Sequence, residues 1–131
     1  MAYILIIGAK SDIAKSIAKK YAENDYNLYL AARKSSELKN FANDIKIRTK
    51  RDVICLDFDV LDYDSHQNFY DSLTNKPSGV ISVVGYLGEQ KKAENDFIEA
   101  QKIIETNYTG IVSILNVVAN DFKKNKRGFI V

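Results

Sequence analysis

The chain has 131 residues, 46% of them hydrophobic and 27% charged, as expected for one globular domain. The net charge of +2 argues against a nucleic-acid-binding protein and a polybasic membrane-surface protein, and a single cysteine, Cys55, excludes an internal disulfide and a cysteine-based metal cage. No apolar run approaches the roughly 20 residues of a membrane helix, and the N-terminus lacks signal-peptide features, so we expect a cytoplasmic protein without a transmembrane segment.

Short apolar runs recur along the chain and predict strands. The first, Tyr3–Ile7, is ended by Gly8, and similar runs follow at residues 28–32, 53–56 and 80–84. None alternates cleanly with polar residues, which is typical of parallel strands covered on both faces. Residues 128–131 form a last apolar piece, which we interpret as the start of a fifth strand.

Periodic apolar residues between these runs predict helices. In the first helix Ile13, Ile17 and Tyr21 form one apolar stripe, flanked by Ala14, Ala18 and Ala22, and Asp12 is the expected N-terminal cap. The longest pattern steps by three or four residues from Ile104 to Phe122 and predicts one amphipathic helix of several turns. Shorter stripes consist of Leu38, Phe41, Ala42 and Ile45, and of Phe69, Tyr70 and Leu73.

The alternation of strands and helices predicts an α/β fold with a doubly wound parallel sheet and right-handed crossovers. The pattern contains no internal repeat, linker or domain boundary, so residues 1–131 are expected to form one domain. Because the sequence stops within an apparent strand, we expect this domain to be incomplete at its C-terminus.

The turn after the first run has the features of an anion site. Gly8 permits a tight turn, and the helix that follows presents free backbone N–H groups and a partial positive charge at its N-terminus. Lys10 adds a mobile positive charge and Ser11 a hydroxyl donor. An ordinary strand-to-helix turn is the alternative interpretation of a lone glycine.

The end of the second predicted strand bears on which anion would bind. An NAD site usually places an acidic residue there, about 20 residues after the glycines, to hold the ribose 2′-hydroxyl. Here Arg33 and Lys34 follow the strand instead. A guanidinium can bind a 2′-phosphate through two donors, so these residues favour NADP(H) over NAD(H). Two solvated cations at a helix start are the alternative.

With these residues in view, the sequence resembles the short-chain dehydrogenase/reductase family. GAKSDIA, at residues 8–14, resembles T-G-x-x-x-G-x-G, although only Gly8 is kept; Ile7, Asp12 and Ala14 stand at the positions of the threonine and the other glycines. Residues 82–85 stand where the family has N-N-A-G, and only the glycine is kept.

Two further positions carry the resemblance. Asp59 and Val60 match the family's Asp-Val pair, which contacts the adenine ring. Asn107 matches the helix asparagine, which in the family kinks the helix and helps to hold a water of the proton relay. The segments VVGYLGEQ and NYTG are also similar to a subgroup of bacterial reductases that act on a keto-sugar attached to a lipid carrier.

The resemblance implies a Rossmann-like sheet of order 3-2-1-4-5, truncated before strands six and seven, and hydride transfer between a nicotinamide cofactor and a carbonyl or alcohol substrate. It implies a homo-oligomeric parent protein and one catalytic residue within this chain, Asn107. The cofactor-binding residues that it implies, together with the residue patterns above, are Gly8, Lys10, Ser11, Asp12, Ile13, Arg33, Lys34, Asp59, Val60, Val84 and Gly85.

The family's catalytic Ser and Y-x-x-x-K follow the fifth strand. No tyrosine of this sequence has a lysine four residues later, so the 131-residue chain alone is predicted to be inactive. If strand five is an open edge and the 104–122 helix lacks its neighbour, we also expect poor solubility or association.

Two other classes of protein share parts of this sequence pattern. A receiver domain could use Asp57 or Asp59 as phosphoacceptor, but the chain lacks the acidic pair that such a domain needs after its first strand. A non-catalytic dinucleotide-binding sensor or scaffold would share the nucleotide contacts and differ only in its missing catalytic residues.

Some residues with chemical potential have simpler interpretations. We interpret His66 as a solvated helix-end histidine and Cys55 as a small buried hydrophobe in a strand. The acidic residues Asp57, Asp59, Asp62 and Asp64 are interpreted as hydrated helix caps rather than a metal site.

Overall fold

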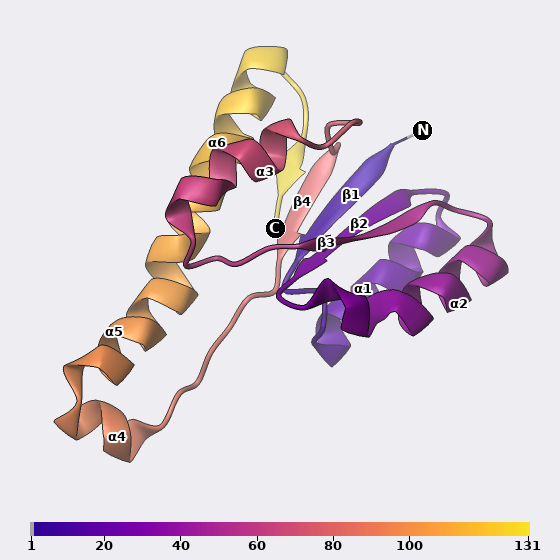
Figure 1. Cartoon of the computed structure of the whole chain (residues 1–131). Coiled ribbons are helices and arrows are strands. Elements are labelled where there is room, and N and C mark those ends of the chain that lie inside the picture. The colour runs from indigo at the N-terminus through magenta and orange to yellow at the C-terminus, as the bar shows by residue number, and fades with distance from the viewer. Residues whose placement is uncertain (1) are drawn as a thin grey trace.

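The computed structural model describes residues 2–131. Its five parallel strands form one sheet of order β3-β2-β1-β4-β5, which confirms the predicted fold class and strand order (Figure 1). The strands are β1 (Tyr3–Ile7), β2 (Asn27–Ala32), β3 (Val53–Asp57), β4 (Gly79–Ser82) and β5 (Phe129–Ile130).

Helices cover both faces of the sheet. The helices α1 and α2 lie on one face, and α3 and α6 lie on the other, while α4 and α5 extend beyond the sheet (Figure 1). The helices are α1 (Asp12–Glu23), α2 (Lys39–Thr49), α3 (His66–Asp71), α4 (Gln90–Asn95), α5 (Phe97–Ile104) and α6 (Gly110–Asn125). No helix within residues 2–131 combines the length and apolarity needed to cross a membrane.

The two cores explain why the strand sequences are continuously apolar. In β1, Ile4 and Ile6 pack under α1 and α2, whereas Leu5 and Ile7 pack under α3 and α6. Since successive side chains of a strand point to opposite faces, every residue of a strand between two helical layers is buried. The central strands β1 and β2 are buried along their whole length.

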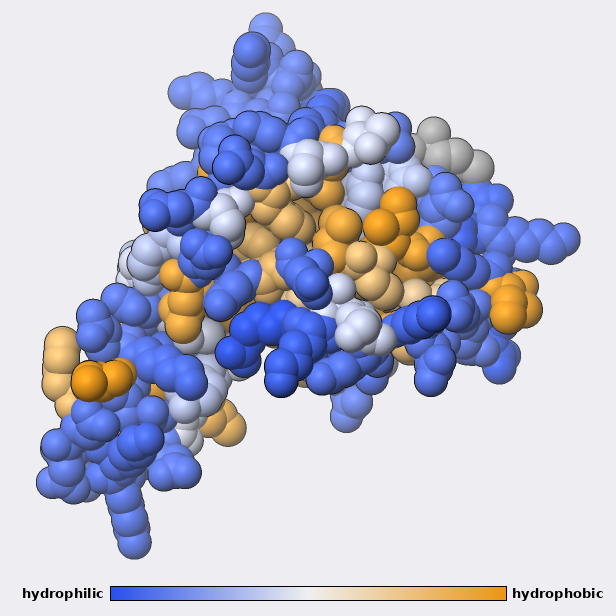
Figure 2. Space-filling view, in the orientation of Figure 1, coloured by the Kyte–Doolittle hydropathy of each residue, from blue (hydrophilic) through white to orange (hydrophobic). Residues whose placement is uncertain are grey.

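The outer strand β3 is less covered. Hydrophobic side chains show in the middle of the face in view, over β3, between helices that are mostly hydrophilic (Figure 2). Ile54 is partly exposed there, and Cys55 is only half-buried because β3 is an edge strand of the sheet. The prediction that Cys55 is buried therefore holds only in part.

Helix α1 buries the alanine side of its predicted stripe. Ala14, Ala18 and Ala22 are fully buried and Ile17 and Tyr21 pack partly buried against the same core, whereas Ile13 is 68% exposed. The small alanine side chains allow the helix to lie close to the sheet, and this close approach decides the buried face. The cap also differs: Ser11, not Asp12, is the N-cap, and its Oγ accepts a hydrogen bond of 3.1 Å from the N–H of Ala14.

The predicted helix from Ile104 to Phe122 is interrupted. A π-helical turn, Glu105–Thr109, separates α5 from α6 and shifts the residues that face the sheet. The buried residues are therefore Gly110, Ile114, Val118 and Phe122, while Ile104 and Tyr108 of the predicted stripe are exposed. Gly110 permits the contact, because a Cβ there would lie 2.5 Å from the carbonyl oxygen of Val60.

The prediction for His66 is wrong. This side chain is 1% exposed and packs against the Phe58 ring, with ring centres 5.0 Å apart. Both ring nitrogens have partners from other parts of the chain, the Ser113 hydroxyl and the Asp59 carbonyl oxygen. Because its polar atoms are satisfied inside the protein, the imidazole can be buried rather than solvated.

Candidate functional site

A cleft of about 250 Å³ lies where the first four strands end. It is lined by residues that follow β1, β2, β3 and β4, together with two residues of the α5 and π-helical segment, Lys102 and Thr106. Ligands of open parallel sheets bind at this carboxyl edge, beside the strand where the order reverses, which here is β1. The predicted site residues that line the cleft are Gly8, Lys10, Ser11, Arg33, Asp59, Val60, Val84 and Gly85.

The remaining predicted site residues surround the cleft without lining it. Asp12 and Ile13 are exposed in the first turn of α1, and Lys34 lines a separate hollow over α2 and β3. Asn107 reaches the cleft only indirectly, through the backbone of Tyr86.

The turn at Gly8 is fixed by its neighbours. Gly8 has a φ of +83°, which an L side chain rarely adopts, and a Cβ there would lie 2.8 Å from the carbonyl carbon of Val83. The N–H groups of Gly8 and Ala9 both donate to the carbonyl oxygen of Ala31, at 2.9 and 3.2 Å. The backbone that opens the cleft is therefore locked between β2 and β4.

The head of α1 offers backbone donors to this turn. The Oγ of Ser11 satisfies the N–H of Ala14, while the N–H groups of the residues before it have no carbonyl partner within the helix. With the partial positive charge of the helix end, these donors can bind an anion in the cleft. The Asp12 carboxylate stands beside them, in the first turn, where the family pattern has its second glycine.

Basic side chains dominate the charge of the cleft. Lys10, Arg33 and Lys102 line it, against one acidic residue, Asp59. Arg33 is exposed just after β2 and, within residues 2–131, forms no ion pair. The Nζ of Lys10 lies 2.9 Å from a carboxylate oxygen of Glu37, which belongs to the 3₁₀ turn Ser35–Leu38 after β2.

Asp57, the last residue of β3, and Asp59, in the loop after it, bond to backbone N–H groups, but they are not the predicted helix caps, and Asp62, the N-cap of the 3₁₀ turn Tyr63–Ser65, forms no side-chain capping bond. Asp57 accepts a hydrogen bond of 2.8 Å from the N–H of Ser35, and this bond holds the pKa of the Asp57 carboxyl below its usual range. Asp59 accepts from the N–H of Leu61 at 2.9 Å. Among the residues that the structure describes, no three His, Cys, Asp or Glu side chains gather as a metal site would require.

Asn107 fixes the segment that follows β4. Its Oδ1 accepts from the N–H of Tyr86 and its Nδ2 donates to the Tyr86 carbonyl oxygen, both at 2.7 Å. It lies in the π-helical turn, where the resemblance to the family implies a kink. The asparagine thus joins the segment after β4 to the helical segment whose residues Lys102 and Thr106 line the cleft.

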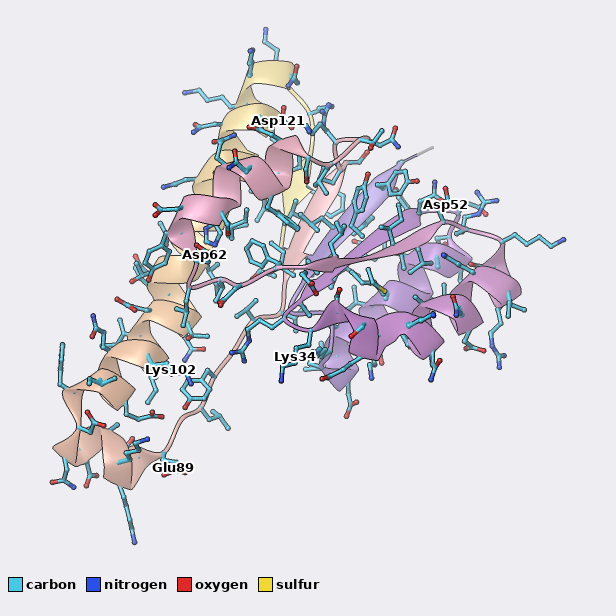
Figure 3. All side chains as sticks on the ribbon, in the orientation of Figure 1. Lys34, Asp52, Asp62, Glu89, Lys102 and Asp121 are labelled. Atoms are coloured by element: carbon cyan, nitrogen blue, oxygen red, sulfur yellow. The ribbon has the colours of Figure 1, made fainter. Side chains whose placement is uncertain are left out.

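A polar group that sequence patterns did not indicate lies on the far wall of the cleft. The Tyr86 hydroxyl donates to a Glu99 carboxylate oxygen at 2.7 Å, and the Lys102 Nζ lies 4.5 Å from the centre of the Tyr86 ring. In Figure 3 the Lys102 side chain points from α5 toward the segment after β4. The hydrogen bond from Tyr86 is the main cause of the lowered pKa of Glu99, and it also raises the pKa of Tyr86. Spacings of three and four residues along a helix, from Glu99 to Lys102 to Thr106, could have indicated this shared face.

The strand order, the glycine turn and the cleft at the carboxyl edge define a Rossmann-like doubly wound domain. The chain belongs to the short chain dehydrogenase family, whose model matches residues 2–131. An uncharacterized oxidoreductase of Mycobacterium tuberculosis is 29% identical over 131 residues, which cover 98% of this chain and 52% of the relative.

Solved structures show the same fold. A short-chain dehydrogenase from Sphingobium yanoikuyae in complex with NADPH matches 99% of this chain and 52% of its own, with a TM-score of 0.87 and 21% identity. A 3-oxoacyl-[acyl-carrier protein] reductase from Brucella melitensis with bound NAD matches 98% of this chain and 51% of its own, with a TM-score of 0.87 and 18% identity. The chain spans about half the length of the curated relatives and solved structures that it matches.

Proposed function

We propose that this chain is the NADP(H)-binding part of an oxidoreductase that transfers a hydride between nicotinamide and a carbonyl or alcohol substrate. The observation that carries the proposal is the position of Arg33, which is exposed and faces the same cleft as the locked turn at Gly8. One cleft thus combines donors for a diphosphate with a guanidinium for an additional phosphate.

The residues of the cleft fit such a cofactor. The diphosphate is assigned to the turn and helix head, and the 2′-phosphate to the cations after β2 and to Lys10, whose Nζ reaches the 3₁₀ turn after β2. The adenine is assigned to the segment after β3 and the remaining contacts to the end of β4. When bound, the cofactor supplies the hydride. The proposed binding residues, in that order, are Gly8, Ser11, Asp12 and Ile13; Lys10, Arg33 and Lys34; Asp59 and Val60; and Val84 and Gly85.

The residues of this chain, not its relatives, support the preference for NADP(H). The two similar structures described above hold NADPH in one case and NAD in the other. In this chain a cation, not a carboxylate, follows β2, and the Asp57 carboxylate after β3 is already bonded to Ser35. A ribose 2′-hydroxyl therefore finds no acid at the end of β2, whereas a 2′-phosphate finds Arg33.

Within this chain, only Asn107 is proposed to serve the reaction, as a positioning residue that holds the backbone beside the cleft. We place the catalytic Ser, Tyr and Lys of the family outside these 131 residues. The chain by itself is therefore expected to bind cofactor and to reduce no ketone. A non-catalytic sensor or scaffold that binds a dinucleotide is the alternative function, and it predicts the same cofactor binding with no turnover by the longer protein.

The substrate class and the oligomeric state are narrower proposals. The segments VVGYLGEQ and NYTG favour a keto-sugar on a lipid carrier, which reduction assays of the longer protein would test. Three large apolar side chains are exposed at the end of α5, in the π-helical turn and at the start of α6: Ile104, Tyr108 and Val112. Their exposure supports a helix-to-helix contact between copies in the parent protein.

The cofactor proposal is tested by Arg33→Ala, with affinities for NADPH and NADH measured by calorimetry. We expect NADPH affinity to fall at least about tenfold, since charged hydrogen bonds contribute about 1.5–3 kcal/mol, while NADH affinity stays unchanged. Arg48→Ala is the matched control, because Arg48 is an exposed arginine of α2 whose carboxylate partner is Asp44. Equal affinities of the original chain for both cofactors, or an unchanged NADPH affinity in Arg33→Ala, would contradict the proposal.

A further inference from the structure

One exposed ion pair connects the turn after β1 to the turn after β2. It joins Lys10 to Glu37, in the 3₁₀ turn Ser35–Leu38, at 2.9 Å. Lys10 lines the cleft with Arg33, whereas Glu37 stands outside it and lines the hollow over α2 and β3 with Lys34. Glu37 is thus a carboxylate placed among the cations that the proposed function assigns to phosphate groups.

The pair is weak enough to be exchanged for another partner. The side chains of Lys10 and Glu37 are 35% and 61% exposed, and ion pairs at such positions contribute little because water and salt screen them. The Lys10 ammonium holds the pKa of the Glu37 carboxyl below its usual range, so Glu37 stays charged near neutral pH. An anion of higher charge that reached Lys10 would replace the carboxylate.

We propose that Glu37 is a specificity-determining residue that competes with the cofactor's 2′-phosphate for Lys10. The inference rests on the proposed function. A phosphate monoester carries about −1.5 to −2 charge at neutral pH, which exceeds the single charge of Glu37, so NADPH opens the pair. NADH has a hydroxyl at this position and leaves the pair closed. Glu37 therefore lowers the affinity for NADPH below the value that Lys10 and Arg33 would give without it, and leaves NADH binding unaffected.

The competition predicts a gain of affinity on substitution. In Glu37→Gln, NADPH should bind roughly three- to tenfold more tightly, and NADH affinity should change less than about twofold. The gain should shrink at high salt, because the pair is exposed. Adenosine 2′,5′-bisphosphate should show the same gain, and 5′-AMP should not.

Asp44→Asn is the matched control. It removes one exposed carboxylate of the neighbouring helix α2, which pairs with Arg48 at 2.9 Å, and changes the net charge of the chain by the same amount. It should leave the ratio of NADPH to NADH affinity unchanged. An equal gain in Asp44→Asn would show a general effect of net charge and overturn the proposal.

A double-mutant cycle with Lys10→Met assigns the effect to the pair. The gain from Glu37→Gln should disappear in the Lys10→Met background, because the carboxylate then has no Lys10 ammonium for which to compete with the 2′-phosphate. A gain that persists there, or an unchanged cofactor ratio in Glu37→Gln, would overturn the competition while the proposed function stands. If the original chain bound neither NADPH nor NADH, the proposed function would fail, and this inference with it.

Discussion

The imidazole Nδ1 of His66 lies 2.7 Å from the hydroxyl oxygen of Ser113. The two residues belong to α3 and α6, and the other ring nitrogen, Nε2, lies 3.1 Å from the carbonyl oxygen of Asp59. One buried side chain therefore connects two helices to the segment after β3 that lines the cleft. In the tautomer with the proton on Nε2, the ring donates to Asp59 and accepts from Ser113.

Replacing His66 by Leu should destabilise the protein by about 1–3 kcal/mol, because the substitution removes both hydrogen bonds of a buried ring and leaves the Ser113 hydroxyl without its partner, while the Asp59 carbonyl oxygen keeps its bond from the Asp62 N–H. Urea unfolding of both variants measures the change. Gln67→Ala is the control, since Gln67 lies next in the helix but bonds to Asp71 at the surface. Adding Ser113→Ala to His66→Leu should cost little more, as residues that share one hydrogen bond are not additive. Equal stabilities of His66→Leu and Gln67→Ala would contradict this account.

The sequence was sufficient for the sheet and insufficient for His66, for a physical reason. The apolar strands are local patterns, and their burial between two helical layers follows from the alternation of strands and helices. Whether a histidine is buried depends on a partner, and Ser113 lies 47 positions away. The buried face of α1 likewise depends on how closely the helix approaches the sheet. The spacing of Ile13 and Ile17 in the sequence does not indicate this distance.

The residues of the candidate site likewise fall into those that local sequence patterns indicate and those that depend on tertiary contacts. Gly8 and Arg33 could be found because a turn and a strand end place them at one edge of a parallel sheet. The contact of Tyr86 with Glu99 and Lys102 was missed because it depends on how α5 lies across the segment after β4. The π-helical turn at Asn107 also shifts which side chains face the sheet, and a regular helical period does not predict this shift.

The glycines that border the cleft should differ sharply in tolerance. Gly8→Ala places a Cβ 2.8 Å from the Val83 backbone, which cannot easily move away. It also forces a residue with a side chain into a positive φ, which such residues rarely adopt. We expect a loss of about 2 kcal/mol or more in the free energy of unfolding. Gly85→Ala is the matched comparison, because its Cβ would lie 3.8 Å from Oδ1 of Asn107, an ordinary van der Waals distance. Thermal unfolding checks both, and a loss in Gly85→Ala as large as that in Gly8→Ala would refute the argument.

Removing the Asn107 side chain should loosen the segment after β4. Asn107→Ala deletes both 2.7 Å hydrogen bonds to the Tyr86 backbone, and we expect the Tyr86 amide to exchange with solvent about tenfold faster. Hydrogen exchange followed by NMR measures this directly. Asn116→Ala, an exposed position of α6, serves as the control. An unchanged Tyr86 exchange rate would mean that other contacts hold this backbone.

The stability of the protein should fall at alkaline pH because of Tyr70. This side chain is buried on α3, and its hydroxyl donates to Asp121 of α6 at 2.5 Å. Burial, followed by the hydrogen bond and the charge of Asp121, raises the pKa of Tyr70 well above its ordinary value. In the unfolded chain the phenol loses its proton near pH 10, whereas the folded protein keeps it. The stabilisation is therefore fully present below about pH 10 and is lost as the pH rises above it.

Tyr70→Phe separates the two effects of this hydroxyl. At pH 8 the variant should be less stable by about 1 kcal/mol, because it lacks the hydrogen bond to Asp121. Between about pH 10 and pH 11 its stability should fall less steeply than that of the original chain, by up to about 1.4 kcal/mol per pH unit, since no buried phenol is left to hold a proton. Urea unfolding across this range provides the test, and Tyr108→Phe, at an exposed position, is the control. If the two chains lost stability in parallel above pH 10, the alkaline sensitivity would have to come from groups other than Tyr70.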